Sequence, residues 1–163
     1  MSDSEAHLDS PLVLACRALA RAMDQFDEAA CGVLGLGRSD LRALNLLEHG
    51  PLGASVLAAR LGLTRPAVTA LIDRLAEAGY VARVAVAGDR RATAVELQPA
   101  TWKAFALVYR PLGERVWAAT AELPESDRRA AVAAIGAMTS AFDDVRARLV
   151  EDAPAGRAGV PGG

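Results

Sequence analysis

Residues 54–97, ASVLAARLGLTRPAVTALIDRLAEAGYVARVAVAGDRRATAVEL, contain two short segments with helical periodicity, followed by two segments with strand periodicity. In the first segment Val56, Leu57 and Leu61 share one face of a 3.6-residue period. Gly62 can then adopt the positive φ that a tight turn between crossed helices usually requires. The pattern predicts a helix, a turn and a second helix within about residues 54–78.

The second helix is predicted to begin at Thr64, a good N-cap residue, with Pro66 tolerated in its first turn. Because a residue before proline is disfavoured in the α region, Arg65 is expected at the helix boundary. Helical spacing predicts a buried stripe of Val68, Leu71, Ile72 and Leu75. The opposite, polar face carries Arg65, Thr69, Asp73, Arg74 and Glu77.

A β-hairpin is predicted over about residues 81–97. Thr93, Val95 and Leu97 alternate with smaller or polar residues, which is typical of a strand with one face on the core. The expected tip is Gly88-Asp89-Arg90-Arg91, in which turn formers precede two adjacent arginines. Two crossed helices followed by a basic hairpin predict a helix-turn-helix with a wing, and therefore binding to duplex DNA.

The N-terminal residues of a helix in the major groove make most of its base contacts, so Thr64, Arg65, Pro66 and Thr69 are the candidates for that role. Arginine can bond the O6 and N7 atoms of guanine, and threonine can donate to a base edge or contact a thymine methyl group. Arg74, near the far end of the helix, is better placed for a backbone phosphate. The alternative for these arginines is an ordinary solvated helix face.

The wing residues are the second group of DNA-binding candidates. Arg90 and Arg91 on a projecting loop would reach the minor groove, where negative potential attracts arginine. Asp89 would be repelled by DNA, so its expected role is to hold an arginine guanidinium by bidentate hydrogen bonds. An ordinary charged hairpin tip is the alternative.

The distribution of charge supports a DNA-binding surface in this region. The whole chain has a net charge of −2, but residues 60–91 contain six arginines and three acids, a net +3 that leaves −5 elsewhere. Positive charge is therefore concentrated where DNA contact is predicted. The alternative is a winged-helix module for protein interaction, whose acidic remainder faces a partner.

Three motifs in residues 53–97 carry a family resemblance: Leu71-Ile72-Asp73-Arg74-Leu75, Gly79-Tyr80-Val81 and the Asp89-Arg90-Arg91 wing. In this order and separation they resemble the winged-helix domain of the MarR family of bacterial transcription regulators. The resemblance extends over roughly residues 10–150. The chain departs from the family's pattern at Gln98 and Thr101, where threonine and glycine are common.

The resemblance implies a homodimer that binds a pseudo-palindromic operator and usually represses transcription. Many members release DNA when a small, often aromatic or phenolic, ligand enters a cleft between the dimerisation region and the DNA-binding lobes. Others sense oxidants through cysteine. The resemblance also implies that Arg74 contacts the DNA backbone and that Asp89 and Arg91 are the wing pair. The side chains that would line a ligand cleft are not identified by the sequence.

The expected fold is mainly α with a small β-hairpin wing: a winged helix-turn-helix domain over residues 10–150, flanked by long dimerisation helices. These helices are expected at about residues 11–31, 99–122 and 124–150, with a disordered start at 1–9 and a flexible tail at 151–163. Three long amphipathic helices outside a small domain need a partner surface, and a homodimer provides one. A monomeric bundle folded back on the winged domain is the alternative.

Cys16 and Cys31 are the two cysteines. An unbroken helix would place their Cα atoms about 22 Å apart, too far for an intrachain disulfide. Cys16 lies where oxidant-sensing members of the family keep their reactive cysteine, so an oxidant-sensing regulator remains an alternative. A buried cysteine acting as a small hydrophobic residue is the other interpretation.

The sequence gives no support for an enzyme, a cofactor or a metal site. His7 and His49 have no evident nucleophile or acid partner, and no Cys/His cluster has metal-ligand spacing. The glycine-rich run 32–37 lacks the strand-then-helix setting of a nucleotide-binding loop and is expected to end the first helix. No apolar run is long enough to span a membrane and the first residues are acidic, so a cytoplasmic protein is expected.

Overall fold

The computed structural model describes residues 10–86 and 89–152, and it leaves the side chains of residues 86–92 undescribed. The predicted disordered start (1–9), the tail from residue 153 and Gly88 of the predicted hairpin tip lie outside the described residues. The chain forms two units, residues 1–116 and residues 117–163.

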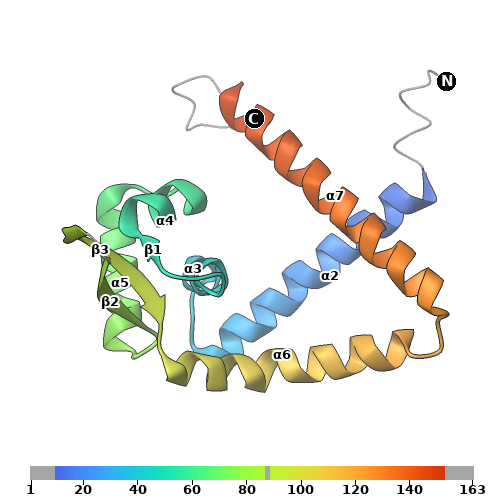
Figure 1. Cartoon of the computed structure of the whole chain (residues 1–163), viewed down its shortest axis with the longest axis horizontal. Coiled ribbons are helices and arrows are strands. Elements are labelled where there is room, and N and C mark those ends of the chain that lie inside the picture. Colours follow the sequence, from blue (N-terminus) through green and yellow to red (C-terminus); the bar gives the residue numbers. More distant parts are fainter. Residues whose placement is uncertain (1–9, 87–88, 153–163) are drawn as a thin grey trace, which may run out of the picture. The chain divides into compact units, whose positions relative to one another are not determined.

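The first unit begins with helices α2 (Pro11–Leu34) and α3 (Arg38–Leu47) (Figure 1). Proline occupies the first turn of α2, where no intrahelical N–H partner is lost. The helix extends three residues beyond the expected bound of about 31 and ends at Leu34, within the glycine-rich run 32–37 that was predicted to end it, where Gly35 adopts φ 65°. Glycine at residue 32 is tolerated in the last turn, and the left-handed residue that ends the helix comes three positions later.

The next helices are α4 (Ala54–Leu61) and α5 (Arg65–Glu77), within the predicted helix-turn-helix. Leu57 and Leu61 of α4 are buried, whereas Val56 is 41% exposed, so only two of the three residues on that face contribute to the core. The whole predicted stripe of α5 is buried.

Three strands form an antiparallel sheet in the order β1-β3-β2: β1 (Leu52–Gly53), β2 (Val81–Val86) and β3 (Asp89–Leu97). β3 pairs with β2 from Val81↔Leu97 onward, and its other edge pairs with β1 through Gly53↔Ala94. The chain therefore has a wing, but Asp89 to Arg91 begin β3 rather than forming the predicted tip. Ala94 is buried as well as Val95, so the simple alternation of exposed and buried residues fails there.

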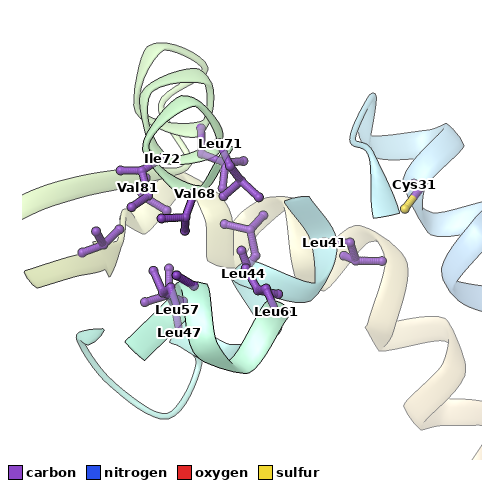
Figure 2. Packing of buried hydrophobic residues seen from close by; sticks show 14 of the residues in the cluster. Cys31, Leu41, Leu44, Leu47, Leu57, Leu61, Val68, Leu71, Ile72 and Val81 are labelled. Atoms are coloured by element: carbon purple, nitrogen blue, oxygen red, sulfur yellow. The ribbon is translucent and has the colours of Figure 1, made fainter. Parts of the chain in front are cut away.

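One hydrophobic cluster joins α3, α4, α5 and the sheet. Leu44 of α3, Leu57 of α4 and Val68 of α5 are each at most 1% exposed, and Figure 2 shows their side chains converging between the three helices. Phe105, in the first half of α6 (Pro99–Thr120), belongs to the same cluster. The apolar residues of α5 pack into this cluster, and this packing fixes the rotation of α5 about its axis. The polar face of α5 therefore points away from the cluster.

The second unit contains the end of α6 and the helix α7 (Glu125–Glu151). All of α7 is described, and none of its residues is buried within the chain. Arg128 donates from Nη1 to the carbonyls of Leu123 and Ala121 at 2.7 and 3.3 Å, and thereby fixes the turn between the two helices.

The described residues are mostly helical and include a small antiparallel sheet, which confirms the predicted fold class.

In the part of the chain that the structure describes, no single helix has both the length and the apolar content of a membrane span. The helices α4 and α5 reach that content only as a pair that bends by 110°.

Candidate nucleic-acid interface

The corner between α4 and α5 is built on one glycine. Gly62 adopts φ 68° and ψ 31°, the left-handed region that side chains rarely enter, and the two helices bend by 110° across it. The amide of Leu63 donates to the carbonyl of Ala58 at 2.9 Å and so closes the end of α4. Gly62 therefore forms the turn that the sequence predicted, and the start of α5 points away from the core.

The start of α5 follows the capping chemistry expected from the sequence. Thr64 is extended, with φ −71° and ψ 159°, and its Oγ1 accepts from the amide of Ala67 at 3.4 Å. Pro66 lies in the first turn, and the helix begins at Arg65, the predicted boundary residue. Thr64, Arg65, Pro66 and Thr69 are all exposed. The structure therefore places the four candidates for base contact together, at the N-cap and in the first two turns of one helix.

A shallow hollow of about 250 Å³ lies between the starts of α4 and α5. Its lining combines polar and apolar side chains: Ala54, Ser55, Arg65, Val68 and Thr69. The hydroxyl of Thr69 donates to the carbonyl of Arg65 at 3.0 Å. Its hydrogen is therefore already used, which leaves an acceptor oxygen and a methyl group on the exposed side.

Arg74 is held by a partner that sequence analysis missed. Its Nη2 and Nε donate to the two carboxylate oxygens of Asp40, at 2.5 and 3.3 Å. Asp40 also accepts from the amide of Gly37 at 3.1 Å and thus caps α3. The carboxylate is 7% exposed and the Arg74 side chain 58%, and these hydrogen bonds raise the pKa of Arg74. The sequence could have shown that Asp40 caps α3, because an acid is favourable at the third position of a helix. It could not show the pairing with Arg74, because the two residues are 34 positions apart and meet only in the folded chain.

A second ion pair braces α5 on the sheet side. Arg83 of β2 donates from Nη2 to Asp73 at 2.6 Å, with both side chains largely exposed. Adjacent residues of α5 therefore pair in different directions, Asp73 with the wing and Arg74 with α3. The sequence placed Asp73 on the polar face but did not identify Arg83 as its partner.

For the wing candidates only the backbone is described. Asp89, Arg90 and Arg91 begin β3, and Val86 pairs with Asp89 after a register shift next to Ala85. Their side chains lie outside the described residues.

The other candidates from the sequence have no site around them among the described residues. Cys31 is 8% exposed, and burial raises the pKa of its thiol, which disfavours the reactive thiolate. Cys16 has intermediate exposure and a free thiol. His49 is exposed, and residues 10–86 and 89–152 contain no group of three or more potential metal ligands.

Two comparisons with known proteins decide the family. A family model described as MarR family matches residues 34–92. The uncharacterized HTH-type transcriptional regulator YcgE of Bacillus subtilis (strain 168) is 32% identical over 148 residues, which cover 90% of this chain and 96% of the relative. The chain belongs to the MarR family. The resemblance carried by the three motifs is thereby confirmed, and the chain is a DNA-binding transcription regulator of that family.

Solved structures of MarR-type regulators share the fold. A mutant of MepR from multidrug-resistant S. aureus has a TM-score of 0.67 and 18% identity, covering 82% of this chain and 99% of that one. Another MepR mutant, bound to an oligodeoxyribonucleotide, has a TM-score of 0.54 and 20% identity, covering 79% and 96%. NadR in complex with 4-hydroxyphenylacetate has a TM-score of 0.56 and 23% identity, covering 77% and 89%.

Proposed function

We propose that the chain is a homodimeric transcriptional repressor that binds a pseudo-palindromic operator and leaves it when a small molecule binds. The observation that carries the DNA-binding part is the exposed start of α5, where Thr64, Arg65, Pro66 and Thr69 lie together and Arg65 and Thr69 line the hollow. A recognition helix makes its base contacts from this end.

Arg65 and Thr69 are the residues proposed to determine sequence preference. Arg65 would bond the O6 and N7 atoms of a guanine. Because Thr69 gives its hydroxyl hydrogen to the Arg65 carbonyl, it would contact bases through its methyl group or accept a hydrogen bond, rather than donate one. Thymine methyl groups and the amino groups of adenine or cytosine match that chemistry.

Arg74 and the wing are proposed to bind the backbone and the minor groove. Two of the three guanidinium nitrogens of Arg74 donate to Asp40, so a phosphate would be met by Nη1 on the exposed side of the group. Arg90 and Arg91 are proposed to contact the minor groove and Asp89 to orient one of them. Support for the wing comes from its position at the start of β3, directly after the link from β2.

The homodimer is proposed from apolar side chains that the chain leaves uncovered. Along α7, Ile135, Phe142, Val145 and Leu149 are 50–67% exposed, and together with Met138 they follow the three- and four-residue spacing of a helix-packing seam. A monomeric soluble domain rarely exposes a continuous apolar stripe of this kind. A second copy of the chain is the proposed partner, and α2 and α6 also carry exposed apolar residues that would contribute.

Release by a small molecule is the third part of the proposal, and NadR with its bound 4-hydroxyphenylacetate supports it by analogy. Among the large side chains of α2 and α6, Met23 and Trp102 are 60% and 50% exposed. Phe26 and Tyr109 instead pack against each other, with ring centroids 5.5 Å apart. Addition of 4-hydroxyphenylacetate to the preformed protein–DNA complex is the first release test, and dissociation is the expected result for an aromatic carboxylate effector.

The deciding experiment is a titration of the purified protein with duplexes selected from a random library, at several salt concentrations. Specific binding with a log–log salt slope of about −0.9 per phosphate contacted is expected, because binding releases counterions. No affinity for any duplex would instead support the alternative of a protein-interaction module.

Two variants separate the proposed roles. Arg65→Ala is expected to cost about 1–3 kcal/mol on the selected duplex and to relax the preference at one base pair. Arg91→Ala is expected to weaken binding to all duplexes, or mainly to those with a narrow minor groove. Arg129→Ala is the matched control, because Arg129 is an arginine on α7 with a 76% exposed side chain. Equal sequence preference and affinity for Arg65→Ala, Arg91→Ala and the control would contradict the assignment.

A further inference from the structure

Tyr80 makes hydrogen bonds to three different elements at the end of the recognition helix. Its hydroxyl donates to the carbonyl of Leu34, the last residue of α2, at 3.0 Å. Its own carbonyl accepts from the amide of Gln98 at 2.9 Å and from the hydroxyl of Thr101 in the first turn of α6. Its amide donates to the carbonyl of Leu75 in α5 at 2.9 Å. One residue therefore links α5, α2 and α6, whose ends approach one another in the first unit (Figure 1).

Local sequence explains why the tyrosine lies at this junction. Gly79 adopts φ 76°, which reverses the chain after α5 and brings Tyr80 back over the last turn. Leu34 is among the last four carbonyls of α2, which lack helical donors, so the tyrosine hydroxyl satisfies a group that would otherwise need another partner. On the other side Thr101 is fully buried, and its hydroxyl has a polar partner in the Tyr80 carbonyl.

The hydrogen bonds of Tyr80 restrain the orientation of α5 in a way that the hydrophobic core does not. Apolar contacts around α5 fix its depth, but burial is non-directional. Hydrogen bonds weaken steeply when their angle changes, so the bonds of Tyr80 restrict the tilt of α5 against α2 and α6. The amide of Gln98 and the hydroxyl of Thr101 both donate to the carbonyl of Tyr80.

We propose that Tyr80 is a positioning residue that holds the recognition helix at one angle to α2 and α6, and thereby restricts the half-site spacing that the dimer accepts. The inference rests on the proposed function, because it takes α2 and α6 as part of the dimer and α5 as the helix in the major groove. In a dimeric helix-turn-helix protein, the separation of the two recognition helices must match the separation of the half-sites. A looser link between α5 and the dimer would tolerate more than one separation.

The test uses the duplex selected by the wild-type protein and two derivatives, with one base pair inserted or removed at its centre. We expect the wild type to prefer the original spacing. Tyr80→Phe removes only the hydroxyl, and the preference is expected to fall by roughly three- to tenfold, the scale of one lost hydrogen bond. Tyr109→Phe is the matched control, because it removes the chain's other tyrosine hydroxyl, which makes a long 3.5 Å bond to Asn45.

Two further variants examine the Thr101 side of the junction. Thr101→Val removes the hydroxyl at nearly constant volume and is expected to reduce spacing discrimination, whereas Thr101→Ser keeps the hydroxyl and is expected to preserve it. Thermal unfolding at matched protein concentration shows whether a variant is merely less stable, because loss of stability lowers binding to all three duplexes alike and leaves their ratio unchanged.

The outcomes separate this inference from the proposed function. A wild-type protein that binds no duplex overturns both. A wild-type protein that binds specifically, with Tyr80→Phe showing the same discrimination as Tyr109→Phe, overturns the positioning role of Tyr80 and leaves the DNA-binding proposal standing.

Discussion

Asp40 is a nearly buried carboxylate with three hydrogen-bond donors, two from Arg74 and one from the amide of Gly37. Asp40→Ala would remove the helix cap and leave the guanidinium without its partner. We expect a loss of about 1–3 kcal/mol in the free energy of unfolding, the scale for hydrogen bonds to charged groups. Urea denaturation at fixed protein concentration measures it.

Asp73 provides the matched comparison at the neighbouring position on α5. Its ion pair with Arg83 is exposed on both sides, so Asp73→Ala is expected to cost less than about 1 kcal/mol. If the two alanine variants lose equal stability, the buried Asp40–Arg74 pair contributes no more than the exposed Asp73–Arg83 pair. That result would contradict a special role of Asp40 in holding α5.

At the scale of elements, the corner between α4 and α5 depends on the backbone of Gly62. Its φ of 68° is unfavourable for a residue with a Cβ atom, although beyond its two chain neighbours no atom lies within 4 Å of where that Cβ would be. Gly62→Ala is therefore expected to destabilise the protein by about 1–2 kcal/mol through backbone strain alone. Thermal or urea unfolding provides the measurement.

Gly32 is the control for that substitution, because it also has free space around a Cβ atom but lies inside α2 without a positive φ. Gly32→Ala is expected to raise stability by about 0.5–1 kcal/mol, since alanine loses less conformational freedom in a helix. A stabilising Gly62→Ala substitution would show that the corner does not require the left-handed conformation.

The elements that the sequence predicted well are those specified by neighbouring residues. Gly62, Thr64 and Pro66 mark the turn and the start of α5 through local backbone chemistry, and the apolar spacing after them marks the buried face. The strand β1 has two residues and no periodicity, so its pairing with β3 could not be predicted. The partners of Arg74 and Asp73 were missed for a related reason, because ion pairs between distant segments depend on packing that periodicity does not encode.

At the scale of the whole molecule, the apolar stripe of α7 is the proposed contact between the two subunits. Phe142 lies in the middle of the stripe and is 57% exposed in the single chain, whereas Ser140 lies on the opposite side of the same helix. Size-exclusion chromatography with light scattering is expected to give a wild-type mass of twice 17.0 kDa. Phe142→Glu is expected to shift this mass toward the monomer, because a carboxylate would be buried without a partner in the interface.

Ser140→Glu introduces the same charge and should leave the dimer intact, so the pair distinguishes loss of the interface from a general effect of charge on α7. The proposed operator symmetry depends on the same contact, since two recognition helices must be present for two half-sites. Phe142→Glu should therefore lose affinity for the selected duplex together with the dimer, while helix content measured by circular dichroism indicates whether the monomer remains folded. A wild-type protein that is monomeric at micromolar concentration and still binds its duplex would remove the homodimer from the proposal, and with it the requirement for a palindromic operator.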